Sequence, residues 1–216
     1  MNRIIILTAI LLTACTTTAS VLDTEGNPIP NKIKIEVPFS PQAPDANWDA
    51  PYQEACEEMS IMMVHHFFEG TELDQEQADA ELLELVAWEE ANGYPEDVNM
   101  EELANIAEKY YKVRTNILYN PTVDDLKVQL AAGNPVIVPA AGRQLGNPYF
   151  SGEGPWYHML VLTGYDRDEF ITNDPGTRRG EDYKYKYDVL LRAVHDWTGV
   201  KEEIGNGRKI ALILTL

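Results

Sequence analysis

Three residues have the types and the order that thiol-based amide chemistry requires. The 216-residue chain has two cysteines, and the second of them, Cys56, precedes His158 and Asp174. A thiolate can attack a carbonyl carbon, a histidine can take up the thiol proton, and an acidic residue can fix the tautomer of that histidine. Asn173, beside Asp174, is the alternative for the last role. The pattern therefore indicates a nucleophile, a general base and an orienting group.

The expected elements bring these side chains together. Cys56 opens an expected helix over 56–68, and a helix N-terminus both lowers a thiol pKa and offers free amides to an oxyanion. Glutamates at positions 54, 57 and 58 oppose this effect, unless they serve the helix dipole and point to solvent. His158 starts an expected strand over 157–165, and Asp174 follows another over 169–172. Neighbouring strands would place the two residues side by side.

The remaining pattern predicts an α+β fold, with an N-terminal helical lobe that contains the nucleophile and packs on a mainly antiparallel sheet. After a short strand over 33–39, helices are expected over 75–92, 100–111 and 123–132, with N-caps Asp74, Asn99 and Thr122. Further strands are expected over 135–140 and 209–216, and a helix over 187–197.

The first cysteine belongs to a targeting segment. Residues 1–14 combine Arg3 with an apolar run that is too short to span a membrane, and they end in Leu-Thr-Ala before Cys15. This layout resembles the bacterial lipobox, which implies a lipid anchor on Cys15, a tether over 15–32 and a position in the bacterial cell envelope outside the cytoplasm. An ordinary cleaved signal is the alternative. Cys56 is then left unpaired, as either an inert buried thiol or a reactive one.

Composition limits the partners. Lys and Arg number 17 against 35 Asp and Glu, a net charge of −18. Nucleic acid is not expected as a partner, because its binding depends on cationic side chains. A cationic or neutral peptide or protein substrate is favoured. His65 and His66 lack the spacing of a metal motif, so we expect no metal and no cofactor. We also expect a monomer.

Four motifs occur in order: Val-Pro-Phe-Ser-Pro-Gln at 37–42, Glu-Ala-Cys-Glu-Glu-Met-Ser at 54–60, the segment 157–166, and Asn-Asp-Pro-Gly at 173–176. Over about residues 33–200 the chain resembles the cysteine peptidases related to bacteriocin leader peptidases, in their branch without a transporter. The resemblance implies a papain-like domain over 33–216, with Cys56 as nucleophile, His158 as base, Asp174 as orienting residue and Gln42 in the oxyanion hole. Glu57 departs from the glycine typical there, and the interval between Gln42 and Cys56 is longer. Gln53 is the rival oxyanion donor.

The expected function is that of a thiol hydrolase outside the cytoplasm. It would cleave amide bonds in peptides or in peptide-containing cell-envelope material through an acyl-enzyme on Cys56. A non-catalytic lipoprotein that binds peptides in a papain-like groove is one alternative. A papain-like acyltransferase is another, because it shares the acyl-enzyme.

Overall fold

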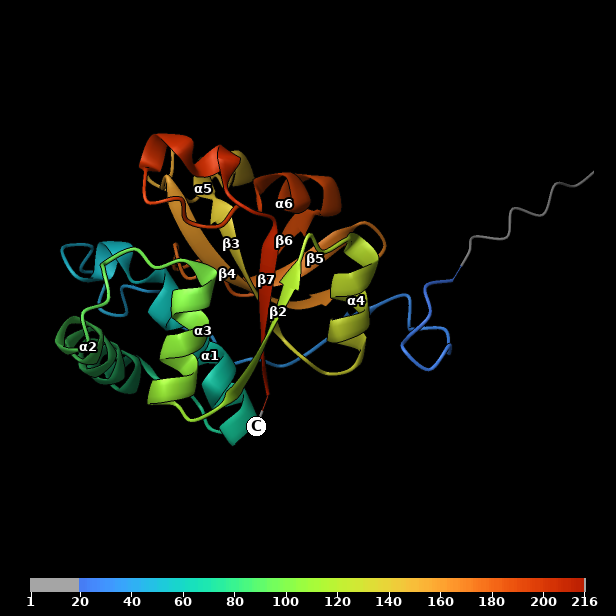
Figure 1. The fold of residues 1–216 in the computed structure, drawn as a ribbon, viewed down its shortest axis with the longest axis horizontal. Coiled ribbons are helices and arrows are strands. Elements are labelled where there is room, and N and C mark those ends of the chain that lie inside the picture. Colours follow the sequence, from blue (N-terminus) through green and yellow to red (C-terminus); the bar gives the residue numbers. More distant parts are fainter. Residues whose placement is uncertain (1–19, 216) are drawn as a thin grey trace, which may run out of the picture.

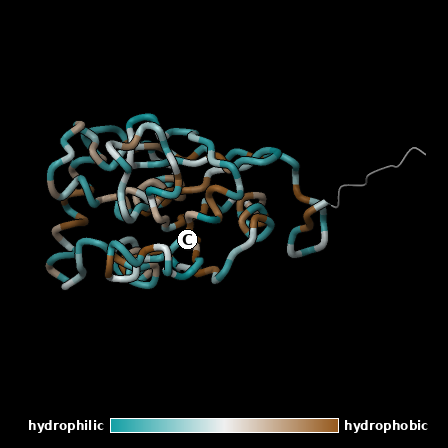
Figure 2. Tube along the Cα trace, turned by 90° about the horizontal axis from the view of Figure 1, so that it is seen from above, coloured by the Kyte–Doolittle hydropathy of each residue, from teal (hydrophilic) through white to brown (hydrophobic). Residues whose placement is uncertain are grey.

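The computed structural model describes residues 20–215 (Figure 1). The expected signal segment 1–14 and the lipidation site Cys15 lie outside the described residues. Residues 20–32, in the expected tether, loop out beside the main body, and the hydrophobic segments concentrate within that body (Figure 2). Within the described range, no helix has the length and apolar character needed to cross a membrane.

Three of the helices form one layer. Helices α1 (Cys56–Glu69), α2 (Gln75–Ala91) and α3 (Met100–Tyr110) lie on one side of the sheet, and α4 (Val123–Ala131) lies on the other (Figure 1). The predicted caps are confirmed, because Asp74 accepts a hydrogen bond from Gln77 N and both Asn99 and Thr122 form capping boxes. Each cap satisfies backbone N–H groups that have no partner inside the helix.

The sheet has seven strands, and every pairing in it is antiparallel. Its order is β2-β7-β3-β4-β5-β6, and the short β1 pairs with β4. All residues of β3 and β4 are buried, which places these strands at the centre of the core. The predicted α+β class with a mainly antiparallel sheet is therefore confirmed. The strands are β1 (Ile33–Lys34), β2 (Arg114–Tyr119), β3 (Val136–Ala141), β4 (Tyr157–Tyr165), β5 (Glu169–Asn173), β6 (Tyr183–Lys186) and β7 (Ile210–Thr215).

Several element bounds differ from the expectation. The strand expected over 33–39 pairs with β4 at two residues only. The helix expected over 187–197 is α6 (Tyr187–Ala193), which ends where Val194 leaves the helix and bridges to Ala140. Strands β2 and β6 are additional, as are the short helices η1 (Tyr52–Glu54), α5 (Gly142–Leu145) and η2 (Lys201–Asn206).

Candidate active site

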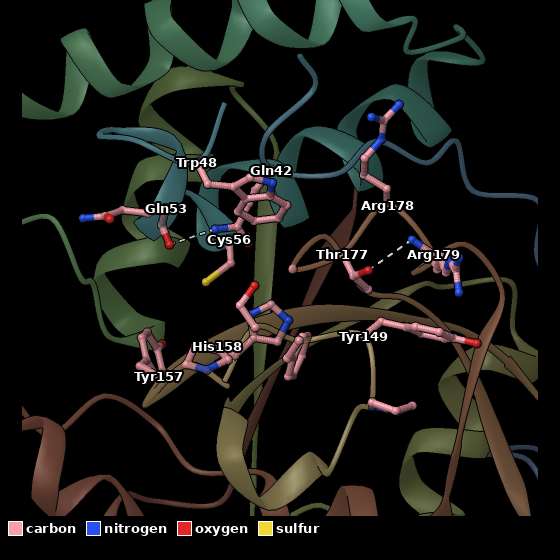
Figure 3. Close-up of a pocket in the computed structure, with 15 residues that line it drawn as sticks. Gln42, Trp48, Gln53, Cys56, Tyr149, Tyr157, His158, Thr177, Arg178 and Arg179 are labelled. Carbon is pink, nitrogen blue, oxygen red and sulfur yellow. Dashed lines mark hydrogen bonds between the residues drawn. The ribbon is translucent and has the colours of Figure 1, made fainter. Parts of the chain in front are cut away.

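One cleft collects the residues singled out by the sequence. It has a volume of about 570 Å³, and its walls include Cys56, His158 and Gln42 (Figure 3). Cys56 comes from the first position of α1 and His158 from the second position of β4, so the helical layer and the sheet meet at this point. The other lining residues are Trp48, Gln53, Pro148, Tyr149, Phe150, Ser151, Pro155, Tyr157, Gly176, Thr177, Arg178 and Arg179.

His158 is held by Asp174 behind the cleft. Asp174 directly follows β5, which pairs with β4, and its Oδ1 lies 2.7 Å from His158 Nε2. This contact favours the tautomer in which Nε2 carries the proton, so Nδ1 keeps a lone pair. Within the described part of the chain, Nδ1 makes no hydrogen bond. The ring can therefore accept a proton on its cleft side.

Asp174 accepts hydrogen bonds from several directions. Besides His158, the donors are the Tyr185 hydroxyl at 2.5 Å, Asn147 Nδ2 at 3.1 Å and the Gly176 N–H at 3.0 Å. Burial acts to raise the pKa of Asp174, but the contacts with His158, Tyr185 and Gly176 outweigh it, and the pKa is lowered. Asp174 is thus a fixed carboxylate that can stabilise a protonated histidine.

The His158 ring is also confined by close packing. A Cβ placed on Gly176 would lie 2.7 Å from His158 Cε1 and 3.0 Å from Phe150 Cε1. Phe150 meets the imidazole edge to face, with ring centroids 5.2 Å apart. Only glycine at position 176 therefore leaves room for this ring orientation.

Cys56 lies in an acidic environment, contrary to the lowered pKa expected from its helix position. Its side chain is buried, and Sγ lies 2.9 Å from Glu57 Oε2. Burial, followed by the charge and the hydrogen bond of Glu57, raises the pKa of the Cys56 thiol well above its usual value. Glu57 does not point to solvent, because it is fully buried and its Oε1 accepts from Val98 N at 3.3 Å.

The buried acidic group extends behind the nucleophile. Glu58 and Glu89 are also buried, and the two share a hydrogen bond. Burial and the negative charge of Glu58 raise the pKa of both Glu57 and Glu89, the latter to about 11. Glu89 is therefore protonated at neutral pH. Glu57 can donate a hydrogen bond to the Cys56 sulfur only when it is itself protonated.

Gln42 and Gln53 differ in placement. Gln42 is buried, and its Nε2 donates to the carbonyl oxygens of Tyr52 and Gln53 at 2.8 and 3.0 Å. These contacts fix the η1 turn just before Cys56, so donation to an oxyanion would require one of them to be released. The Gln53 side chain is exposed and points away from the Cys56 sulfur (Figure 3). The oxyanion role of Gln42 stays a prediction.

Comparison with known proteins gives this architecture a family. The model of the Peptidase_C39 like family matches residues 34–203. The chain belongs to this family. A structure described as a C39-like peptidase from Bacillus anthracis is similar over 85% of this chain and 98% of its own, with a TM-score of 0.53 and 18% identity. Xylellain, a cysteine protease from Xylella fastidiosa, is similar over 87% of this chain and 86% of its own, with a TM-score of 0.34 and 16% identity. No curated protein matches the chain.

The fold of this C39-like family member is thus the papain-like peptidase fold that the motifs implied. Asn173, the alternative orienting residue, instead donates its side-chain amide to the Val37 carbonyl at 3.0 Å and anchors the N-terminal segment. Asn147 and Tyr185 were not predicted from the sequence. The alternation of Tyr and Lys at 183–186 indicates a strand, but nothing in it shows that Tyr185 faces Asp174.

One group of carboxylates lies apart from the cleft residues. Among the described residues, the carboxylates close enough to share an ion are Asp166 and Asp168, in the turn between β4 and β5, and Glu169, the first residue of β5. Lys184 pairs with Asp166 at 2.5 Å, and Lys186 pairs with Asp168 at 2.7 Å. Two lysine side chains therefore already offset two of the three negative charges of this group.

Proposed function

We propose that this C39-like family member hydrolyses peptide bonds with Cys56 as nucleophile, His158 as general base and Asp174 as orienting residue. The contact of 2.7 Å between His158 Nε2 and Asp174 Oδ1, on a histidine that lines the same cleft as Cys56, carries the proposal. Because Nε2 is bound to Asp174, Nδ1 is the nitrogen of His158 that can act as the base in the cleft. A nucleophile, a base and its orienting group are the parts that acyl transfer requires.

The proposed reaction proceeds through a thioester. His158 Nδ1 takes the Cys56 proton, and the sulfur attacks the peptide carbonyl to form a tetrahedral oxyanion near the N-terminus of α1. The Cys56 N–H and Gln42 are the predicted oxyanion donors. The C–N bond breaks as His158 gives its proton to the leaving amine. A water then loses a proton to His158 and attacks the thioester, which releases the acid and restores the thiol.

The proposal is tested by substrate profiling with a library of internally quenched peptides. Wild type is expected to cleave a subset, and Cys56→Ala and His158→Ala are expected to lose that activity. Cys56→Ser serves as a matched variant that retains size but lacks thiolate reactivity. Full turnover by Cys56→Ala on the cleaved peptides would contradict the mechanism.

A binding module is the second candidate, and the environment of Cys56 favours it. Burial and Glu57 raise the pKa of the thiol, which reduces the thiolate present before substrate binds. A module of this kind would bind peptides in the cleft with equal affinity in wild type and Cys56→Ala and would cleave none. An acyltransferase would instead pass the same acyl group to an added amine.

We also propose that the protein is anchored in the bacterial cell envelope through a lipid on Cys15, outside the cytoplasm. Support comes from the lipobox-like run that ends at Cys15 and from the position of residues 20–32, which form a loop beside the domain (Figure 1). Mass spectrometry of the N-terminal peptide tests this. Acylated Cys15 in the membrane fraction is expected, together with release of a Cys15→Ala variant from that fraction. A free Cys15 thiol would contradict the proposal.

A further inference from the structure

The charge inside the cleft is opposite to the charge of the chain. Arg178 and Arg179 are the lining side chains that carry a permanent charge. No Asp or Glu of the described residues lines the cleft. The protein as a whole carries a net charge of −18. A substrate that matches the overall composition would be cationic, whereas one that matches the cleft carries negative charge.

The two arginines stand on a constrained loop. This loop joins β5 to β6, and its start and end are tied together because Asp174 N donates to Gly180 O at 3.0 Å. Inside the loop, Arg179 N donates to Thr177 Oγ1 at 3.2 Å, and Gly180 N donates to Thr177 O at 3.1 Å. The segment that places Gly176 against His158 therefore also fixes the backbone of the arginines.

Arg179 has a defined position in the wall of the cleft. Its guanidinium lies over the Tyr149 ring at 4.9 Å from the centroid, a cation–π contact that leaves the N–H edge open. Tyr149 and Arg179 lie on the same side of His158, while Gln53 lies on the other (Figure 3). A group bound by Arg179 would thus sit to one side of the Cys56 and His158 pair.

Neither arginine is neutralised within the described residues. The ion pairs of that range use other cations, such as Lys184 with Asp166 and Arg208 with Glu101, whereas Arg178 and Arg179 pair with no carboxylate. Guanidinium groups bind carboxylates through two parallel hydrogen bonds. An unpaired, exposed guanidinium beside the proposed reacting pair is therefore free to receive a carboxylate from the substrate.

We infer that the cleft selects peptides that carry a carboxylate on the Thr177 side of the scissile bond, and that Arg179 binds this carboxylate. The inference rests on the proposed function of the same cleft. Two sources share this chemistry, the side chain of an Asp or Glu residue and the terminal carboxylate of the peptide. Tyr149 and Trp48, both exposed at the cleft, offer aromatic surfaces to the neighbouring substrate side chains.

Two matched pairs of peptides test the inference and separate the sources. One pair differs by Glu or Gln next to the scissile bond, and the other by a C-terminal acid or amide. For wild type, kcat/KM is expected to favour the carboxylate member of at least one pair by roughly tenfold or more, mainly through KM. Arg179→Gln is expected to reduce that ratio toward one, because it raises KM more for the carboxylate peptides than for the neutral ones. Arg167→Gln, an exposed arginine in the turn between β4 and β5, is the matched control and is expected to keep the ratio.

Binding to Cys56→Ala, followed by fluorescence anisotropy with the same four peptides, makes the test independent of turnover. The same preference in Kd, lost in Cys56→Ala/Arg179→Gln, supports the inference even if no peptide is cleaved. Equal binding of the members in both pairs would overturn it, as would a preference that survives in the double variant Arg178→Gln/Arg179→Gln. Failure of the proposed hydrolysis appears separately, as bound peptides that wild type leaves intact.

Discussion

The Sγ atom of Cys56 lies 2.9 Å from Oε2 of its neighbour Glu57, and both side chains are buried at the start of α1. The protonation states of the two groups are consequently linked. A neutral Glu57 can donate its proton to a thiolate, whereas an ionised Glu57 accepts the thiol proton and opposes thiolate formation. The residue that departs from the typical family motif therefore controls the proposed nucleophile.

Glu57→Gln should make Cys56 more acidic. The amide carries no charge and can donate an N–H to the sulfur, so the pH midpoint of iodoacetamide alkylation should fall by about one unit or more. Glu54→Gln is the control, because Glu54 pairs with Lys201 and not with the sulfur. An equal shift in both variants, or none in Glu57→Gln, would rule out the direct contact as the cause.

Gly176→Ala should remove activity while keeping the fold. The added Cβ would overlap with His158 Cε1 at 2.7 Å, and rotation of the ring would break its contact with Asp174. We expect kcat to fall by about a hundredfold, the range in which a positioned base contributes. Circular dichroism should stay unchanged. Gly205→Ala is the control, because its Cβ would meet only Gln144 Nε2 at an ordinary 3.6 Å. Wild-type kcat in Gly176→Ala would contradict the packing argument.

Gln42→Ala distinguishes two roles of this side chain, donation to the oxyanion and stabilisation of the η1 turn. If Gln42 donates to the oxyanion, kcat should fall by about 10²-fold to 10³-fold with KM and thiol alkylation unchanged. If its role is limited to holding the η1 turn, alkylation of Cys56 and the melting temperature should change as well. Gln53→Ala, which alters an exposed side chain, is expected to stay near wild type. A larger loss of kcat in Gln53→Ala would assign the role to Gln53 instead.

Glu89→Gln should stabilise the protein at high pH. In the unfolded chain this carboxyl titrates near 4.5, but burial and Glu58 raise its pKa in the fold to about 11. Between these values the native state holds a proton that the unfolded state has lost, so the stability present below pH 4.5 declines as pH rises. The amide should therefore increase the free energy of unfolding by roughly 2 kcal/mol at pH 8 and little at pH 5. Urea unfolding of the variant against Glu90→Gln, an exposed neighbour, measures the difference. Equal gains at both pH values would contradict the titration argument.

Much of the fold follows from local rules. Three helix N-termini could be predicted from their capping residues, because capping depends on residues within one turn. These N-caps are Asp74, Asn99 and Thr122. Strand β4 is predicted with its observed bounds because a long apolar run is buried on both faces. Strand β2 is missed, since its mixed polar residues are specified by pairing with β7, which is far away in the sequence.

In the candidate site, too, some features could be predicted from the sequence and others depend on distant contacts. Types and order pointed to Cys56, His158 and Asp174, and strand pairing brings the last two into contact. The environment of the thiol could not be predicted, because exposure of Glu57 depends on how Val98 and the segment before α3 close over it. Helix position alone gave the opposite direction for the pKa of Cys56.

The loop between β5 and β6 contains residues that position His158 and residues that are exposed at the cleft. Asp174 and Gly176 must stay as they are, because they set the His158 ring, while Arg178 and Arg179 project outward from a backbone already fixed by Thr177 and Gly180. Substitution at the two arginines can consequently alter which peptides are accepted without disturbing the proposed chemistry. Positions 178 and 179 are therefore suitable sites at which to diversify this protein by directed evolution.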